Sequence, residues 1–301
     1  MIPPGARGEL IFAEHCHIAL RVDVVVRDMA DGAVFRSYPI PALNTSMLLL
    51  GDGTSIGSDA AYALARAGVS FFYTGSGGTP LWAGVTADLL PISGVSEYGP
   101  TEYMQAWVRR FFEESQRLEA AKELLRTRAR LTQEFWGRAL DFGAPDLAGL
   151  YKGTEFLREI ESASNTQELL AAAGRQTKRV YTTLTAVMGA AGFSRKPHGN
   201  DLINRRIDHF DHLLNGCTLL VLHGLGLSVS FPALQDKTRR GGLVFDIAGL
   251  LNEGLALPLA FQHGMGGTAE TDARGHFIDT IHQEQVIPLL FRETRRILCG
   301  K

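Results

Sequence analysis

The stretch "QDKTRRGGLVFDIAGLLNEG", residues 235 to 254, combines a basic loop, a pair of glycines and one acidic residue behind an apolar run. Carboxylates bind divalent metals and basic side chains bind phosphates, so this combination could form a metal-dependent site for nucleic acid. Such a site would need a second carboxylate on the same helix face, three or four residues after Asp246. Position 249 is glycine and position 250 is leucine, so the local pattern favours Asp246 as a helix N-cap.

Basic side chains are concentrated in two segments. Between Arg175 and Arg206 the chain has seven Lys or Arg and one acidic residue. Arg175, Lys178 and Arg179 are spaced to form one cationic edge of a helix that could meet successive phosphates, and Lys237, Arg239 and Arg240 precede Asp246. Charge runs are also typical of solvated helix faces, so these clusters by themselves leave both interpretations open.

Three further motifs favour structural roles. His15 and His17 would lie on one face of a strand, as a metal pair requires, but no third ligand is near in sequence, which favours polar residues on an exposed face. The turn at Gly51 and Gly53 follows an apolar run as a phosphate-binding loop does, yet Ile56 stands where the dinucleotide fingerprint needs glycine. We expect this segment and the Gly-rich stretch at 75–80 to be turns.

The composition limits the class of protein. A chain of 301 residues that is 45% hydrophobic favours two domains, and a net charge of −2 argues against a wholesale polycation. The three cysteines form no CxxC pair, and the first residues have no apolar core of a signal peptide. The most apolar run contains His223 and two glycines, which is more typical of a core helix than of a membrane span. We expect a cytoplasmic protein with no membrane segment.

The elements that must position these residues change in character along the chain. Strand patterns run from Glu9 to about Phe72, including one long strand through "IALRVDVVVRD" and a turn at "DMADG", interrupted by one helix with Ser58 as N-cap and a stop at Gly68. Residues 101–136 then keep helical periodicity for some nine turns, and helical patterns continue to the C-terminus. The pattern predicts an α+β protein, with a β-rich domain over 1–95 and an all-α domain over 96–301.

Several stretches, in order along almost the whole chain, match one known family: "FAEHCHIAL", "SEYGPTEYMQAWVRRFFEESQRLEAAK", "LLAAAGRQTKRVY", "DKTRRGGLVFDIAGLL" and "LPLAFQH". The chain resembles the CRISPR-associated spacer-acquisition integrases, the "Cas one" family, and most narrowly their subtype I-F branch. The resemblance implies an N-terminal β-sandwich, a C-terminal α-helical domain and a homodimer. It also implies a small ferredoxin-like partner subunit, fused to a helicase-nuclease in subtype I-F, and joining of double-stranded DNA to the CRISPR array.

The resemblance also implies a metal site, and here the chain departs from the family. Active members hold Mg²⁺ or Mn²⁺ with a Glu, a His and an Asp, with a further Asp nearby. The Glu position falls on Ala173, the His position on Gln235 and the second Asp position on Gly249, so that Asp246 is the remaining family ligand. Alanine and glycine carry no donor atom, and a neutral amide is a weak substitute for imidazole. We therefore expect no bound metal and no metal-dependent activity.

Three hypotheses follow. The first is a DNA-binding, catalytically degenerate member of the family that acts as a structural or regulatory subunit, with DNA contacts from the two basic segments: Arg175, Lys178, Arg179, Lys237, Arg239 and Arg240. The second is a working enzyme with shifted ligands, chosen from Asp236, Glu253, Glu168 and His223 beside Asp246. The third is a protein-only scaffold anchored by Trp107 and Phe111, although such aromatic residues are more often core.

Overall fold

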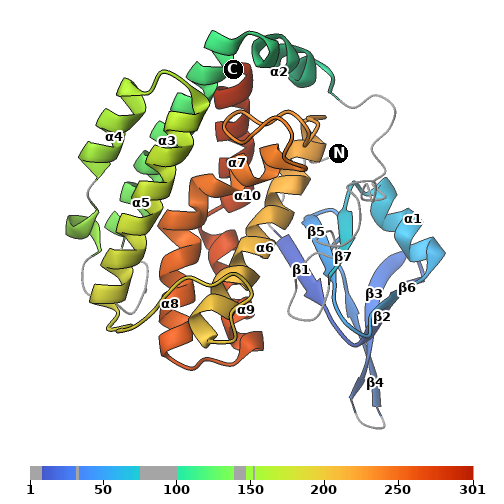
Figure 1. Ribbon diagram of the computed structural model, residues 1–301. Coiled ribbons are helices and arrows are strands. Elements are labelled where there is room, and N and C mark those ends of the chain that lie inside the picture. Colours follow the sequence, from blue (N-terminus) through green and yellow to red (C-terminus); the bar gives the residue numbers. More distant parts are fainter. Residues whose placement is uncertain (1–8, 32–33, 75–99, 139–146, 152, 301) are drawn as a thin grey trace. The chain divides into compact units, whose positions relative to one another are not determined.

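The structure is a computed structural model that describes residues 9–31, 34–74, 100–138, 147–151 and 153–300 (Figure 1). It divides into two compact units. One contains residues 1–99 and 278–289, and the other contains 100–277 and 290–301. The Gly-rich stretch at 75–80 lies outside the described residues.

The described residues up to 74 in the first unit form two sheets and one helix. A parallel sheet has the order β1 (Glu9–Ala13), β5 (Thr45–Leu50), β7 (Ser70–Tyr73). The second sheet has the order β4 (Val34–Pro39), β3 (Val24–Asp31), β2 (Cys16–Arg21), β6 (Ser55–Ile56), and α1 (Ser58–Arg66) follows β6. Both sheets and α1 contribute to one apolar core, which includes Ile18, Val25, Leu48, Leu64 and Phe71. The predicted fold class is confirmed for this part of the chain.

One strand prediction in this unit was wrong. The run through "IALRVDVVVRD" is not one strand, because the chain reverses at Val22 and Asp23, which both have positive φ (47° and 64°). A valine is an unusual residue for this conformation, and Asp23 is the one residue of the pair whose type is typical of it. The chain reverses again at the end of "DMADG", as predicted, because β3 ends at Asp31 and pairs antiparallel with β4, with Asp31 opposite Val34.

Smaller corrections concern α1 and the histidines. The N-cap of α1 is Gly57, not Ser58, while Gly68 has a φ of +75° just beyond the helix, as expected of a C-terminal stop. His15 lies between β1 and β2 with a φ of +48°, outside either strand. His17 hydrogen-bonds Ser55 Oγ over 2.8 Å, so the two imidazoles are not a pair on one strand face.

The second unit is helical. Its elements are α2 (Glu102–Phe112), α3 (Glu114–Gly137), η3 (Ala148–Leu150), α4 (Gly153–Ser162), α5 (Thr166–Val187), α6 (Leu202–Gly224), α7 (Gly242–Leu251), η4 (Asn252–Ala256) and α8 (Leu257–Met265). They are followed by α9 (Glu270–Gln283), α10 (Val286–Thr294) and η5 (Arg295–Cys299), of which residues 278–289 belong to the first unit. The short elements η4 and η5 are π-helical, and α7, η4 and α8 form a continuous helical stretch.

The predicted nine-turn helix over 101–136 is broken into α2 and α3. Glu113 has an extended backbone with a ψ of 104°, although no glycine or proline marks the break. Trp107 and Phe111 are buried, as expected of core residues, and the Trp107 indole N–H donates to the Phe231 carbonyl over 2.9 Å. Packing around Phe231, distant in sequence, accompanies a bend that helical periodicity did not predict.

The stretch 242–265 is long and apolar enough to cross a membrane by length and composition. Most of its apolar window, 83%, is buried inside the fold. Such burial is typical of a core helix in a folded domain.

Candidate functional site

The first expected ligand position lies on α5. Asn165 caps this helix by accepting the Glu168 N–H over 2.9 Å, and the Glu168 carboxylate accepts the Ser164 N–H over 2.7 Å. This arrangement resembles a capping box, shifted to the residue before the N-cap, so the Glu168 carboxylate is used at the helix start. Ala173 lies one and a half turns further on and is buried.

Asp246 is not an N-cap, because α7 begins at Gly242 and Asp246 lies in the helix interior. Its buried carboxylate accepts three backbone N–H groups of the preceding loop: Ala233 at 2.6 Å, Leu234 at 3.0 Å and Gln235 at 3.1 Å. Burial raises the pKa of Asp246 to about 6, and the three N–H bonds and Arg117 oppose this rise. The carboxylate therefore holds the loop against α7.

The same loop is held from its other side by Arg117 of α3. The buried Arg117 guanidinium donates to the carbonyls of Pro232 at 3.1 Å and Gln235 at 2.7 Å. The loop also lies so close to α7 that a Cβ on Gly242 would meet the Pro232 side chain at 2.8 Å. Glycine at 242 and the two charged side chains together fix the backbone of Gln235, the second expected ligand position.

The third expected ligand position, Gly249, lies on α7. Thr177 on α5 donates to the Glu253 carboxylate over 2.9 Å, and this contact links α5 to the helical stretch that contains Gly249. Ala173 and Gly249 each stand four residues before one partner of this contact. A Cβ on Gly249 would have no atom within 4 Å, so the position is open.

The Gln235 N–H is hydrogen-bonded to Asp246, but the groups at the expected ligand positions do not fit a divalent cation. Ala173 and Gly249 have no side-chain donor, and Asp246 is engaged by three N–H groups. In the described ranges, no group of three or more His, Cys, Asp or Glu side chains is arranged to hold a metal ion. This applies equally to the shifted ligands of the second hypothesis.

Each shifted ligand has another role in the fold. Glu253 is fully buried in η4, where it forms an ion pair with Arg128 of α3. Asp236 is exposed and accepts the Thr238 N–H over 2.8 Å within the basic loop. His223 lies in the last turn of α6, where burial lowers its pKa.

The basic residues of α5 are only partly available to bind phosphates, because some of them already form ion pairs. Arg175 pairs with Glu159 of α4 at 2.9 Å. Arg179 pairs with the same carboxylate at 2.8 Å and with Glu155 at 3.0 Å. Lys178 is exposed and makes no ion pair with a described residue. Two of the three predicted phosphate contacts on α5 are therefore already partnered by acids that lie more than 15 residues earlier in the chain.

The basic residues of the loop are exposed and have no carboxylate partner among the described residues. The Lys237 ammonium lies 5.5 Å from the Phe111 ring centroid, and the Arg239 guanidinium lies 4.1 Å from that of Phe245. Arg239 also donates to the Gln235 amide oxygen over 2.6 Å. Arg240 makes no recorded side-chain contact within the described part of the chain.

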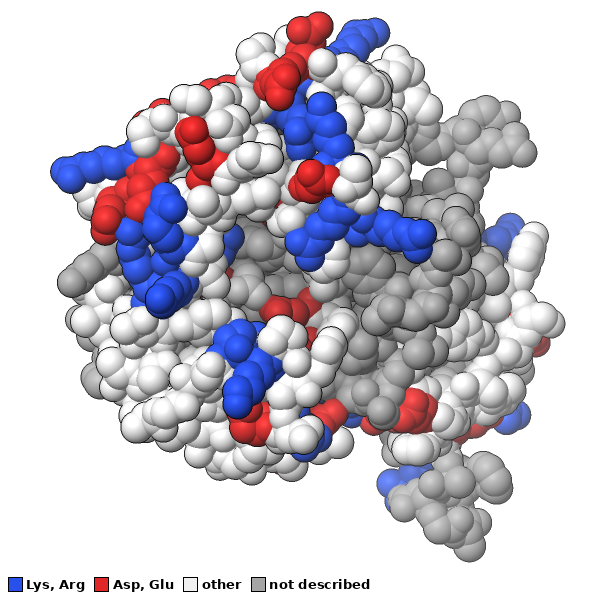
Figure 2. Space-filling view, in the orientation of Figure 1, with Lys and Arg blue, Asp and Glu red and all other residues white. Residues whose placement is uncertain are grey.

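An open cavity of about 970 Å³ adjoins the expected ligand region along α5. It begins at Gly174 and Thr177 and is lined by Tyr181, Phe193 and several hydroxyl side chains, with Lys178 and Arg195 in its wall. Figure 2 shows Lys and Arg groups around a hollow in the helical unit, with Asp and Glu groups beside them. This face of the helical unit therefore carries both positive and negative side chains, and its basic side chains form separate small groups.

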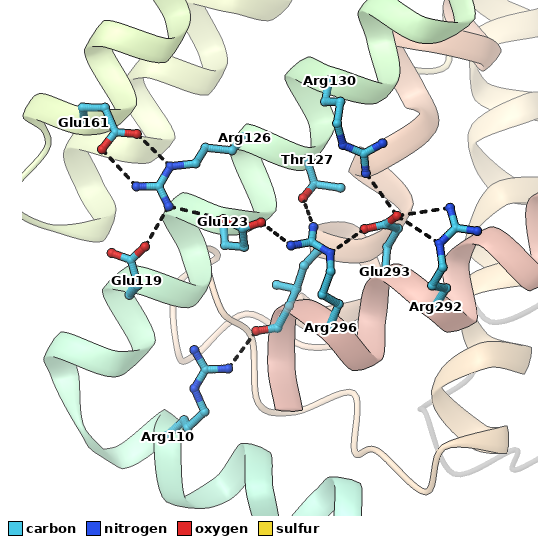
Figure 3. Close-up of polar contacts among 11 residues, drawn as sticks. Arg110, Glu119, Glu123, Arg126, Thr127, Arg130, Glu161, Arg292, Glu293 and Arg296 are labelled. Carbon is cyan, nitrogen blue, oxygen red and sulfur yellow. Dashed lines mark hydrogen bonds and ion pairs between the residues drawn. The ribbon is translucent and has the colours of Figure 1, made fainter. Parts of the chain in front are cut away.

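In a second arginine-rich region, the arginines form ion pairs with carboxylates of the same unit. Figure 3 shows that Arg126 meets Glu161, while Glu293 accepts from three arginines of α3, α10 and η5. Glu293 is only 3% exposed, so the centre of this ion-pair network lies in the packed interior of the unit. The residues concerned are Glu119, Glu123, Arg126, Thr127, Arg130, Glu161, Arg292, Glu293 and Arg296.

Sequence reasoning missed the residues that support the site. Arg117, Arg128 and Glu159 make their contacts with residues that are distant in the chain or on another helix. On their own helices they follow the ordinary pattern of charged residues between apolar ones, so no local signal distinguished them. Only the three-dimensional packing reveals their roles.

Comparison with known proteins identifies the family. The model of the family described as CRISPR associated protein Cas1 matches residues 11–256. The CRISPR-associated endonuclease Cas1 of Pseudomonas aeruginosa (strain UCBPP-PA14) is 36% identical over 293 residues, which cover 94% of this chain and 90% of the relative.

Solved structures share the fold. A crystal structure of a TtCas1–DNA complex has a TM-score of 0.68 at 18% identity, covering 97% of this chain and 92% of that one. TM1797, a CAS1 protein from Thermotoga maritima, has a TM-score of 0.71 at 13% identity, covering 95% and 96%. The sequence match over most of the chain and the shared two-domain layout confirm the resemblance, and the chain belongs to the CRISPR-associated Cas1 family.

Proposed function

We propose that this protein is a DNA-binding member of the Cas1 family, of the subtype I-F branch, that lacks a competent divalent-metal site. It would act as a structural or regulatory subunit in spacer acquisition. The observation that carries the proposal is the combination of an intact scaffold with Ala173, Gln235 and Gly249 at the expected ligand positions.

The absence of ligands argues against metal-dependent integration. A divalent ion gives up hydration water when it binds, so its ligands must offset the lost hydration free energy. One carboxylate carries too little negative charge to do so. Asp246 is moreover turned toward the backbone of the 233–235 loop, and the buried Glu253 has Arg128 as its counterion. Asp246 thus has a structural role that needs no metal, and Glu253 is paired through its Oε1 atom, while its buried Oε2 atom has no hydrogen-bond partner among the described residues.

The retained basic residues support DNA binding. A fold relative was solved as a complex with DNA, and the Pseudomonas relative is named an endonuclease. In this chain, Lys178 and the loop residues Lys237, Arg239 and Arg240 are exposed and carry no ion pair with a described residue. Binding through such contacts needs no metal and depends on displacing counterions from DNA.

The expected assembly follows from the family. We propose a homodimer that joins the small ferredoxin-like partner subunit in the cytoplasm and engages double-stranded DNA. An active copy of the same family would supply the chemistry.

The test is DNA binding measured by fluorescence anisotropy, with and without EDTA, over a range of NaCl concentrations. We expect an affinity that EDTA leaves unchanged. The slope of log K against log salt should be about −3.6 if four basic residues per subunit meet phosphates and about −5.4 if all six do. A protein with no affinity for DNA at low salt would contradict the proposal. Neutralising Arg175, Lys178 and Arg179 should weaken DNA binding, whereas a protein-only scaffold would keep its partner binding unchanged.

A further inference from the structure

Gln235 has the most firmly fixed backbone in the basic loop. Its N–H is held by Asp246, its carbonyl by Arg117, and its Cβ would lie 3.4 Å from a Cβ placed on Gly242. The direction in which its side chain leaves the backbone is therefore set by the core beneath it.

The Gln235 side chain in turn fixes Arg239. Its amide oxygen accepts from Arg239 Nη1 over 2.6 Å, and the guanidinium is held against the Phe245 ring at 4.1 Å from the centroid. An amide oxygen and an aromatic ring orient a guanidinium without cancelling its charge. The arginines of α5 differ, because Glu155 and Glu159 neutralise them.

We propose that Gln235 is a positioning residue that holds the Arg239 guanidinium as a preformed binding site for one DNA phosphate. This inference rests on the proposed DNA binding. A guanidinium has five N–H donors in a planar fork that suits phosphate, and the described contacts use one of them. Because the side chain is already ordered, less rotamer freedom is lost when a phosphate binds.

Arg240 provides the matched control. It is the next residue, is equally exposed and carries the same charge, but no recorded side-chain contact orients it within the described residues. Replacing either arginine with alanine should make the salt slope shallower by about 0.9. Arg239→Ala should weaken DNA binding several-fold more than Arg240→Ala does.

The decisive variant is Gln235→Ala, which removes no charge. It should weaken DNA binding about three- to tenfold, as expected for one side chain that must now be ordered on binding, and should leave the salt slope unchanged. In the Arg239→Ala background the same change should have no further effect. Arg239→Lys should keep the slope but lose affinity, because an ammonium cannot be held in the same planar contact.

Equal DNA affinity of Gln235→Ala and the unchanged protein would overturn the inference while leaving the proposed function standing. The inference would also be overturned if Gln235→Ala weakened DNA binding by the same factor in the Arg239→Ala background. Failure of the unchanged protein to bind DNA would overturn both. Thermal unfolding of each variant checks that the loop and the fold are retained.

Discussion

The ion pairs between α4 and α5 predict that removing two acids strengthens DNA binding. Glu155 and Glu159 make three ion pairs with Arg175 and Arg179, at 2.8 to 3.0 Å. A DNA phosphate that binds these arginines must compete with the carboxylates. The double change Glu155→Gln and Glu159→Gln removes that competition while keeping the size of both side chains.

The magnitude follows from the exposure of the pairs. The arginine side chains are 55% and 30% exposed, and such ion pairs contribute about 0.2–1 kcal/mol each. Releasing three of them should improve DNA binding by about 1–2 kcal/mol, or five- to thirtyfold, at low salt. Two more arginines would then displace counterions, so the slope of log K against log salt should become steeper by about 1.8.

Anisotropy titrations of a labelled duplex at several NaCl concentrations measure both quantities. Glu119→Gln with Glu161→Gln is the matched control, because it removes the same charge from carboxylates that pair with Arg126 on α3. The reasoning would be refuted if the Glu155 and Glu159 variant bound DNA no more tightly than this control. Arg175 and Arg179 would then be structural residues and not DNA contacts.

Two predictions concern ionisable side chains of the helical unit. Burial raises the pKa of Asp211 to about 7, so the folded state keeps a proton that the unfolded chain releases near pH 4, and stability should fall as the pH rises from about 4 to 7. Asp211→Asn should abolish this fall and stabilise the protein by about 1–3 kcal/mol at pH 8 but not at pH 4, measured by urea unfolding; equal effects at both pH values would contradict the assignment. Glu253→Ala should destabilise the protein by about 3–5 kcal/mol in the same assay, because it leaves the Arg128 guanidinium buried without its carboxylate, and a loss below 1 kcal/mol would show that the pair is not needed.

The fold class could be predicted from the sequence because the periodicities are strong. Alternation and β-branched residues marked most strands, and apolar spacing marked the helices. Boundaries set by tertiary contacts could not be predicted. The break at Glu113 accompanies packing on Phe231, and the turn at Val22 lacks the glycine or asparagine that usually marks such a turn.

The candidate site shows the same division. The resemblance to the family located Ala173, Gln235, Asp246 and Gly249, and the structure connects Gln235 to Asp246 and α5 to the helical stretch that contains Gly249. The role of Asp246 could not be predicted, because its three partners are backbone N–H groups that carry no signature in residue type. The α4 acids were missed for a related reason, since pairing between separate helices depends on how the helices pack.

The most direct test of the central claim is a strand-transfer assay with Mn²⁺, a short DNA duplex and array DNA. It compares the unchanged protein with the triple variant Ala173→Glu, Gln235→His and Gly249→Asp. The open space around Gly249 should accommodate the new carboxylate. Activity of the triple variant, with none from the unchanged protein, is the result expected of an intact integrase scaffold that lacks its metal ligands. Metal-dependent strand transfer by the unchanged protein would contradict the account and would assign catalysis to other ligands beside Asp246.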